Sequence, residues 1–312
     1  MPLLKVEDLK VYYPIRGGFF RTVKDYVKAV DGISFSIREG ETYGLVGESG
    51  CGKTTTGRTI IGLNKATDGK VLLQSTDGEV DLTKLSRRKF QKYRRDIQMI
   101  FQDPYSSLNV RKRVRDIIAE PLRNFESLTQ EEEEQRIIDA LAKVGLGPDA
   151  MYKYPHQFSG GQRQRIGIAR ALVISPRLII ADEPVSALDV SVQAQVLNFM
   201  KDIQKEYNLS YLFISHDLGV VRHMCDRIGI MYNGRLVEEG TTEDIFENPQ
   251  HLYTKRLLSA IPNIDPKKRR ENQALREQVN REFEEKARQF FDENGRIYDL
   301  KQISATHYVA IP

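Results

Sequence analysis

The sequence has few cysteines and no long apolar run, and each absence excludes a class of protein. Its 312 residues include only two cysteines, Cys51 and Cys225, too few for a disulfide framework and typical of a cytosolic chain. No apolar run approaches the roughly 20 residues that span a bilayer. The first residues lack the charged head and long apolar stretch of a secretion signal. If the protein works at a membrane, other subunits must cross it.

The chain also lacks a strong charge of either sign. Lys and Arg number 47 and Asp and Glu number 43, for a formal net charge of +4. That excess is too small to indicate nucleic-acid binding. Hydrophobic residues make up 40% and charged residues 29% of the chain. The chain can therefore bury a sizeable core and is not wholly disordered.

Short apolar runs that alternate with helical patterns predict a largely parallel α/β sheet. Strands are predicted at 3–13, 33–37, 42–46, 70–74, 97–101, 177–182 and 211–216, with a hairpin over 227–239 that turns at Asn233-Gly234. Helices are predicted at 53–62, within 110–175 and at 251–260, and residues 85–95 are helix-like. Residues 14–28 contain Pro14, Gly17 and Gly18 and are predicted to form a loop or insertion. Residues 265–294 are rich in charge and helix formers, and residues 298–312 are predicted to be extended.

Residues 47–54 match the pattern G-x-x-x-x-G-K-[ST]. They follow a predicted strand and open a predicted helix, which is the context that this pattern requires. The glycines let the backbone turn its N–H groups toward phosphate oxygens, and the helix N-terminus adds positive partial charge. Lys53 would reach the β- and γ-phosphates, and the Thr54 hydroxyl would hold Mg²⁺. The sequence therefore predicts a nucleotide phosphate site.

Two further segments supply groups that such a site needs. Asp182 ends a buried apolar run, where a carboxylate is placed to hold Mg²⁺, and Glu183 could orient or deprotonate water. A common loop start is the alternative for this Asp-Glu-Pro sequence. Residues 159–162, Ser-Gly-Gly-Gln, predict a helix N-cap, with Ser159 and Gln162 at capping-box spacing. The same helix start would also attract an anion.

In this order, the motifs resemble those of the nucleotide-binding subunit of an ATP-binding-cassette (ABC) transporter. Residues 47–54 resemble the Walker A motif, residues 178–183 Walker B with its catalytic glutamate, and residues 158–162 the signature motif, with Phe158 in place of the usual leucine. Residues 186–189 resemble the D-loop, His216 the switch histidine and Gln102 the Q-loop glutamine. The resemblance covers about residues 3–262.

The resemblance implies a set of residues for ATP hydrolysis. The catalytic residues would be Glu183 as general base, His216, Lys53 and Gln102, and Mg²⁺ would be held by Thr54, Gln102 and Asp182. Nucleotide contacts would come from Tyr13, Gly47, Glu48, Ser49, Gly50, Cys51, Gly52, Lys53, Thr54, Thr55, Ser159, Gly160, Gly161, Gln162 and Asp189. Tyr13 would stack on adenine, and Tyr12 is the alternative.

The implied fold is an α/β P-loop NTPase of ABC type, with a mixed sheet core, an antiparallel β subdomain and an inserted helical subdomain. The nucleotide-binding domain would span residues 1–262, with the helical subdomain at about 103–175, and a charged C-terminal extension would span 263–312. Two cassettes would meet head to tail with ATP between them. Their closing motion would reach membrane subunits through a groove near Gln102 and the helical subdomain.

An insertion between Tyr13 and Ala29 resembles the oligopeptide permease branch of this family, and so do residues 101–109, 154–159 and 248–258. The resemblance implies the second ATPase subunit of an oligopeptide importer, at the cytoplasmic face of the membrane. Its partners would be a second, different ABC ATPase subunit, two transmembrane permease subunits and an extracytoplasmic substrate-binding protein, with no nucleic acid. Two copies of this chain are the alternative to a pair of different cassettes. Because no cysteine follows Cys225, no iron–sulfur cluster is expected.

Several alternatives stay open at this point. Nickel and glutathione importers share the branch, so peptide is the favoured cargo but not a deduced one. A soluble cassette ATPase acting on ribosomes or DNA is disfavoured, because the chain has one cassette and no sustained heptad pattern between Lys53 and Ser159. Intact Glu183 and His216 argue against a cassette that binds ATP without turnover. The C-terminal extension would be either an arm against the partner cassette or a solvated charged helix with a loose end.

Overall fold

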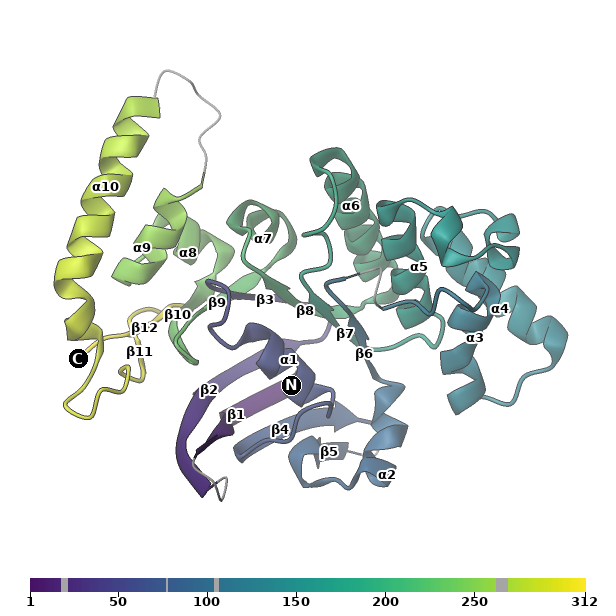
Figure 1. Cartoon of the computed structure of the whole chain (residues 1–312), viewed down its shortest axis with the longest axis horizontal. Helices are drawn as coiled ribbons and strands as arrows, with labels where there is room; N and C mark the ends of the chain where they lie inside the picture. Colours follow the sequence, from purple (N-terminus) through teal and green to yellow (C-terminus); the bar gives the residue numbers. More distant parts are fainter. Residues whose placement is uncertain (18–21, 77, 104–106, 262–268) are drawn as a thin grey trace. The chain divides into compact units, whose positions relative to one another are not determined.

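The computed structural model describes residues 1–17, 22–76, 78–103, 107–261 and 269–312, and its contacts divide the chain into two units. The first unit comprises residues 1–3, 37–41 and 73–212, and the second comprises residues 4–36, 42–72 and 213–312. Each unit is therefore assembled from segments that are far apart in the sequence. Figure 1 labels the helices and strands of both units.

One sheet of the second unit has the strand order β11-β12-β10-β9-β3. Its strands are β3 (Thr42–Val46), β9 (Arg227–Tyr232), β10 (Arg235–Thr241), β11 (Leu300–Gln302) and β12 (Tyr308–Ala310). β3 and β9 are parallel, whereas β9 and β10, β10 and β12, and β11 and β12 are antiparallel pairs. The end of the chain, predicted to be extended, thus adds two strands beside β10 and is not a loose end.

The predicted hairpin at Asn233-Gly234 is confirmed as the connection between β9 and β10. The φ angles are 45° at Asn233 and 81° at Gly234, and a two-residue hairpin turn needs positive values at both positions. The turn also reaches the predicted phosphate loop, because the Gly234 N–H donates to the Cys51 carbonyl oxygen at 3.0 Å. The hairpin therefore supports residues 47–54 from one side.

A second set of strands in this unit has the order β2-β1-β4. They are β1 (Pro2–Gly17), β2 (Thr22–Arg38) and β4 (Asp68–Ser75), whose ends at residues 2–3, 37–38 and 73–75 belong to the first unit. The loop predicted over residues 14–28 is wrong where the structure describes it, and residues 18–21 lie outside the described residues. Val23, Tyr26 and Val27 are exposed. Such β-branched and aromatic residues favour a strand even where they cover no core.

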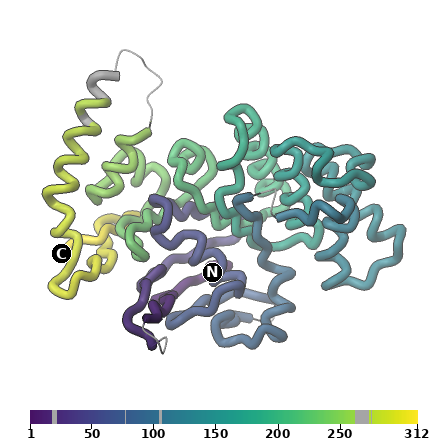
Figure 2. Tube along the Cα trace, viewed as in Figure 1, coloured from purple at the N-terminus to yellow at the C-terminus, as the bar shows by residue number. Residues whose placement is uncertain are grey.

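The helices of the second unit begin with the predicted helix after the phosphate loop. They are α1 (Lys53–Ile60), α7 (Leu218–Met224), α8 (Thr242–Glu247), α9 (Leu252–Ser259), α10 (Arg269–Lys286) and the 3₁₀ turn η6 (Ala287–Phe290). α10 lies beside α9, as the yellow-green end of the chain shows in Figures 1 and 2. Within the charged extension, residues 269–286 thus form a helix that packs on α9.

In the first unit, β6 (Ile97–Ile100) and β7 (Leu178–Asp182) are parallel neighbours, with Ile97 opposite Leu178 and Ile100 opposite Ala181. β5 (Gly78–Asp81), η1 (Leu82–Lys84), α2 (Arg87–Phe90) and η2 (Gln91–Arg94) precede them. β8 (Ser210–Ser215) crosses the division, with residues 210–212 in the first unit and 213–215 in the second. β7 and β8 are buried along their whole length, which explains their uninterrupted apolar sequences.

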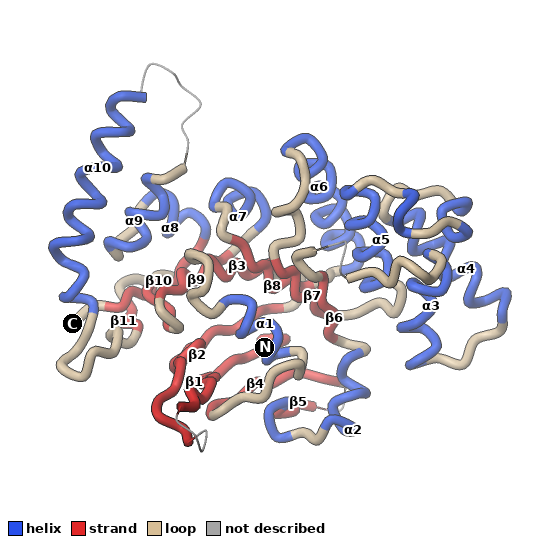
Figure 3. The backbone as a smooth tube through the Cα atoms, in the orientation of Figure 1, coloured by secondary structure: helices blue, strands red, loops and turns tan. Residues whose placement is uncertain are grey.

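The segment predicted to be mainly helical is confirmed as a helical cluster in the first unit. It contains α3 (Val114–Phe125), α4 (Gln130–Lys143), η3 (Pro148–Tyr152), η4 (Pro155–Gln157) and α5 (Gly160–Leu172), followed by α6 (Val190–Tyr207). α3, α4 and α5 contact one another, and they are drawn in blue in Figure 3. The Glu133 carboxylate on α4 accepts two 2.7 Å hydrogen bonds from Arg123 on α3. The acidic run at the start of α4 is therefore partly an ion-pair surface between helices.

Among the described residues, no helix combines the length and the apolar character needed to cross a bilayer.

Candidate functional site

Residues 47–54 run from the end of β3 into the first turn of α1 and pass very close to neighbouring backbone. A Cβ at Gly47 would lie 2.1 Å from the Met231 carbonyl oxygen, and a Cβ at Gly52 would lie 2.1 Å from the Ala29 carbonyl oxygen. Gly52 also has a φ of 110°, which L side chains rarely adopt. Glycine is required at both positions because backbone atoms on β2 and β9 leave no room for a side chain.

Lys53 lies inside this loop with its side chain only 5% exposed. Its Nζ donates to the Gly47 carbonyl at 2.6 Å and to the Glu48 carbonyl at 2.8 Å, and it lies 3.6 Å from the Cys51 sulfur. α1 begins after Gly52, which provides no side-chain cap. The first N–H groups of α1 therefore have no capping side chain, and a buried ammonium lies beside them, which suits a bound anion.

Cys51 is a buried thiol of this loop. Burial raises the pKa of Cys51, and the nearby Lys53 opposes that rise. A neutral buried thiol is a poor nucleophile. Cys51 therefore suits the role of a small side chain that fills space in the loop.

Gln102 and Glu183 come together in the first unit. Gln102 follows β6 and Glu183 follows β7, and because these strands are parallel their carboxyl ends share one edge. The Gln102 Nε2 donates to the Glu183 Oε2 at 2.7 Å. Glu183 has a φ of 47°, an unusual value for a non-glycine residue that is common at functional positions. Asp182, the last residue of β7, is buried.

The predicted helix cap at Ser159 is confirmed as a capping box at the start of α5. The Ser159 Oγ accepts from the Gln162 N–H at 3.3 Å, and the Gln162 Oε1 accepts from the Ser159 N–H at 3.0 Å. Both side chains are exposed, whereas Gly161 is buried. A Cβ at Gly161 would lie 2.3 Å from the Val192 Cγ1. Gly161 thus lets the starts of α5 and α6 touch.

Asp189 is the N-cap residue of α6 and follows a loop that is held by side chains. Gln193 Nε2 donates to the carbonyls of Val185 and Leu188, each at 3.0 Å. The Ser186 hydroxyl donates to the Glu183 carbonyl at 3.1 Å. The predicted D-loop is therefore tied both to α6 and to the end of β7.

Tyr12 and Tyr13 differ in how their side chains are used. The Tyr12 hydroxyl donates to the Asp31 carboxylate, and burial together with Asp31 raises the pKa of Tyr12 to about 12. Tyr13 is 43% exposed. An exposed aromatic face is what stacking on a base requires, so this arrangement favours Tyr13 over Tyr12.

His216 directly follows β8 and is exposed. The next residue, Asp217, caps α7, because its Oδ1 accepts from the Gly219 N–H at 2.8 Å and from the Val220 N–H at 3.3 Å. His216 therefore stands at the carboxyl end of a buried strand, in the unit that contains the phosphate loop.

The predicted residues fall into two sets, one in each unit. The second unit contains Tyr13, residues 47–55 and His216, and the first contains Gln102, Asp182, Glu183, residues 159–162 and Asp189. Within the described ranges, no three His, Cys, Asp or Glu side chains gather as a metal site. Mg²⁺ at Thr54, Gln102 and Asp182 stays a prediction, and it would need nucleotide oxygens as further ligands.

One contact to the phosphate loop was not predicted from the sequence. The Glu48 N–H donates to the hydroxyl of Tyr253 on α9 at 3.0 Å. Tyr253 lies within residues 248–258, whose sequence indicated only a resemblance to one branch of a family and not a contact to the phosphate loop.

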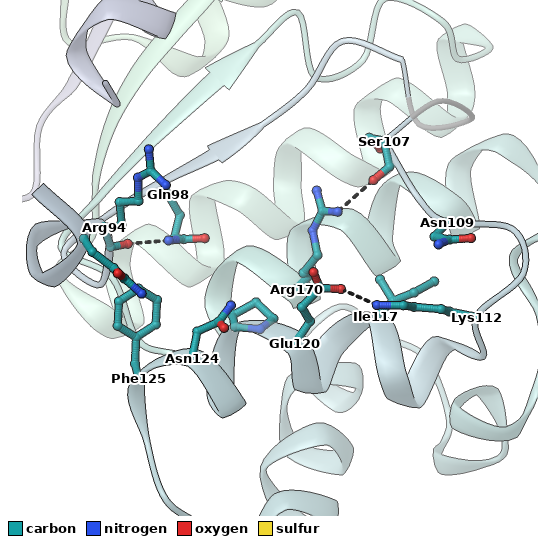
Figure 4. A pocket seen from close by; sticks show the side chains of 12 residues that line it. Arg94, Gln98, Ser107, Asn109, Lys112, Ile117, Glu120, Asn124, Phe125 and Arg170 are labelled. Carbon is teal, nitrogen blue, oxygen red and sulfur yellow. Dashed lines mark hydrogen bonds and ion pairs between the residues drawn. The ribbon is translucent and has the colours of Figure 1, made fainter. Parts of the chain in front are cut away.

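A pocket of about 570 Å³ lies in the first unit beside α3 and α5 (Figure 4). The Arg170 guanidinium donates to the Ser107 carbonyl at 2.8 Å, and Lys112 pairs with Glu120 at 2.8 Å. Burial lowers the pKa of Arg170, and the charge of Glu120 opposes that change. The pocket is lined by Gln91, Arg94, Gln98, Ser107, Asn109, Lys112, Ile117, Glu120, Pro121, Asn124, Phe125 and Arg170.

Two protein families match the chain. The family described as ABC transporter matches residues 30–186. The family described as oligopeptide/dipeptide transporter, C-terminal region, matches residues 237–291. The second match includes α8, α9 and α10.

The similarity to known proteins extends over most of the chain. The oligopeptide transport ATP-binding protein OppF of Lactococcus lactis is 57% identical over 310 residues, which cover 99% of this chain and 96% of the relative. The dipeptide transport ATP-binding protein DppF of Escherichia coli is 51% identical over 270 residues, covering 86% of this chain and 79% of the relative. Among solved structures, cbiO1 of Clostridium perfringens, part of an ABC transporter complex, is similar with a TM-score of 0.68 at 28% identity, covering 82% of this chain and 95% of that one.

Proposed function

Because the chain belongs to the ABC transporter family, we propose that it binds and hydrolyses ATP as a subunit of a membrane importer of oligopeptides. The observation that carries the ATPase part is the phosphate loop, with buried Lys53 beside the uncapped start of α1. The match of residues 237–291 and the names of the similar proteins support peptide as the cargo.

Nucleotide binding would use the phosphate loop and Tyr13. The α1 N–H groups would receive phosphate oxygens, and the Lys53 ammonium would exchange its bonds to the Gly47 and Glu48 carbonyls for bonds to phosphate. The position of the ammonium inside the loop supports this role. The exposed ring of Tyr13 would stack on the adenine.

Hydrolysis would use Glu183 as the general base. Its carboxylate would take a proton from water as the water oxygen bonds to the γ-phosphorus and the bond to the β–γ bridging oxygen breaks, releasing ADP and phosphate. The 2.7 Å hydrogen bond from Gln102 supports this role because it orients the carboxylate. His216 would hold the γ-phosphate and the water in line. Mg²⁺ would be held by Thr54, Gln102 and Asp182 and would neutralise phosphate charge.

A second cassette would complete the pair of ATPase subunits. Residues 159–162 and Asp189 would cover a nucleotide held by the partner, which we propose to be a different ABC ATPase subunit. The close approach of Gly161 to Val192 supports this role, because it brings the starts of α5 and α6 together. ATP would then stabilise the closed pair through contacts that the open pair lacks.

The membrane subunits would dock at the pocket of Figure 4. We place the chain at the cytoplasmic face, with two transmembrane permease subunits and an extracytoplasmic substrate-binding protein as the further partners. The pocket is lined by Arg170, Lys112 and Glu120 among others. This lining suits a docking helix that carries charged residues of both signs.

Two variants test the ATPase. Lys53→Ala should abolish ATP binding by the purified full-length chain, because it removes the ammonium that compensates phosphate charge. Glu183→Gln should keep ATP binding and stop phosphate release, because an amide cannot accept the proton. Calorimetry with ATP and a phosphate-release assay measure the two effects. Full turnover by Glu183→Gln, or wild-type affinity in Lys53→Ala, would contradict the assignments.

The transport role needs a separate experiment. The Glu183→Gln chain should be purified from gently solubilised membranes with ATP, which holds the closed state. Recovery of two membrane subunits and a different cassette is expected. The associated binding protein is then titrated with peptides, nickel and glutathione, and preference for nickel or glutathione would overturn the peptide assignment. Recovery of ribosomes or DNA-bound proteins without membrane subunits would overturn transport itself.

A further inference from the structure

Helix α9 reaches the phosphate loop through one buried hydroxyl. The Glu48 N–H donates to the Tyr253 Oη at 3.0 Å, and Tyr253 is fully buried. The Glu48 carbonyl accepts from the Lys53 Nζ at 2.8 Å. The main chain of Glu48 is therefore tied on one side to Tyr253 and on the other to the lysine that would bind phosphate.

Packing holds the Tyr253 ring in place. Its ring centroid lies 4.4 Å from that of Tyr232 on β9 and 6.0 Å from that of Phe283 on α10. The Tyr253 N–H donates to the His251 Nδ1 at 3.1 Å, and the His251 N–H donates to the buried Glu238 carboxylate at 3.0 Å. The hydroxyl is thus pre-organised by β9, α9 and α10 together.

A second contact from α9 reaches the same residue but contributes less. Arg256 pairs with the Glu48 carboxylate at 3.3 Å, with the two side chains 34% and 49% exposed. Exposed ion pairs of this kind add little. The Glu48 N–H is part-buried and donates to a hydroxyl whose own residue is fully buried, so the loss of this acceptor carries a larger penalty. Burial also raises the pKa of Tyr253 well above its ordinary value, so the phenol stays neutral. The hydroxyl is therefore the contact that matters.

We propose that Tyr253 is a positioning residue for ATP binding, whose hydroxyl holds the Glu48 peptide and thereby keeps the phosphate loop in its binding conformation. This inference rests on the proposed ATPase function. Without the hydroxyl, the Glu48 N–H would lose its acceptor and the loop would populate other conformations. ATP would then have to select the competent one, which lowers its apparent affinity. The segment matched as a transporter C-terminal region would thus act on the nucleotide.

Tyr253→Phe tests this, because it removes the hydroxyl and keeps the ring. The matched control is Tyr211→Phe, since Tyr211 is also fully buried and its hydroxyl donates to the Met200 carbonyl at 3.3 Å in the first unit. On the purified full-length chain, Tyr253→Phe should weaken ATP binding about 2- to 10-fold. KM should rise by the same factor with kcat unchanged, because the loss affects ground state and transition state alike. Tyr211→Phe should leave ATP affinity unchanged.

Hydrogen exchange at the Glu48 amide gives a direct readout of the bond. The amide should exchange faster in Tyr253→Phe than in the wild type or in Tyr211→Phe. Phe283→Leu keeps the hydroxyl but loosens its packing, so it should give an intermediate rise in both exchange and Kd. Unchanged Kd and exchange in Tyr253→Phe, or an equal loss of affinity in Tyr211→Phe, would overturn the inference. Failure of the wild type to bind ATP any better than Lys53→Ala would instead overturn the proposed function.

Discussion

Acid should destabilise the protein through His251, the buried N-cap residue of α9. The ring is 3% exposed. Its Nδ1 accepts from the Tyr253 N–H at 3.1 Å, and its Nε2 is buried without a hydrogen-bond partner among the described residues. Burial lowers the pKa of His251 from its ordinary value of 6.5 to about 4. Protonation would also convert the accepting nitrogen into a donor and break the cap.

The sign and size of the effect follow from these two values. The unfolded chain binds the proton more tightly than the folded chain, so the stabilisation is fully present above pH 6.5 and is lost as the pH falls toward 4. With the folded value of about 4, linkage gives a loss of about 2 kcal/mol at about pH 5 and about 3 kcal/mol at full protonation. The loss should appear in the window from about pH 6.5 to about pH 4, above the range in which the paired carboxylates titrate.

His251→Asn isolates this contribution, because asparagine also caps helices but does not titrate. Urea unfolding followed by circular dichroism should be compared at about pH 7.5 and about pH 5. The variant should start less stable, because its side chain is smaller, yet lose about 2 kcal/mol less than the wild type on acidification. The exposed His156 provides the control His156→Asn, which should keep the wild-type pH dependence. The reasoning is refuted if wild type and His251→Asn lose equal stability.

Three further variants test close packing. Gly47→Ala should abolish ATP binding in calorimetry, because its Cβ would lie 2.1 Å from the Met231 carbonyl oxygen and the backbone cannot yield; retained affinity would contradict the loop geometry. Gly161→Ala should cost about 1–3 kcal/mol in urea unfolding, because its Cβ would lie 2.3 Å from the Val192 Cγ1, and adding Val192→Ala should restore part of that loss. Phe283→Ala should cost about 3–5 kcal/mol by leaving a cavity beside α9, and it should make α10 the first segment cut in limited proteolysis; unchanged cleavage would argue against this packing.

Much of the local structure was predictable because its signals act within a few residues. β3 runs from Thr42 to Val46 as predicted, and the Asn233-Gly234 turn and the Ser159 cap have the expected geometry. The loop predicted over residues 14–28 was wrong because the prediction gave Pro14 and Gly17 more weight than the strand-forming side chains around Val23. Proline and glycine mark positions where a strand can end, whereas pairing with the neighbouring strand decides where it does end.

The order of motifs along the chain was enough to indicate the chemistry and the family. Tertiary structure alone decided which of these groups touch. Gln102 and Glu183 are 81 residues apart in the sequence and share a hydrogen bond only because β6 and β7 are parallel neighbours. Tyr253 lies 205 residues from Glu48, and its hydroxyl meets the phosphate loop only because α9 is held by β9 and α10. Periodicity, caps and turns are local properties of the sequence, whereas strand order and packing join distant residues, and no local pattern carries that information.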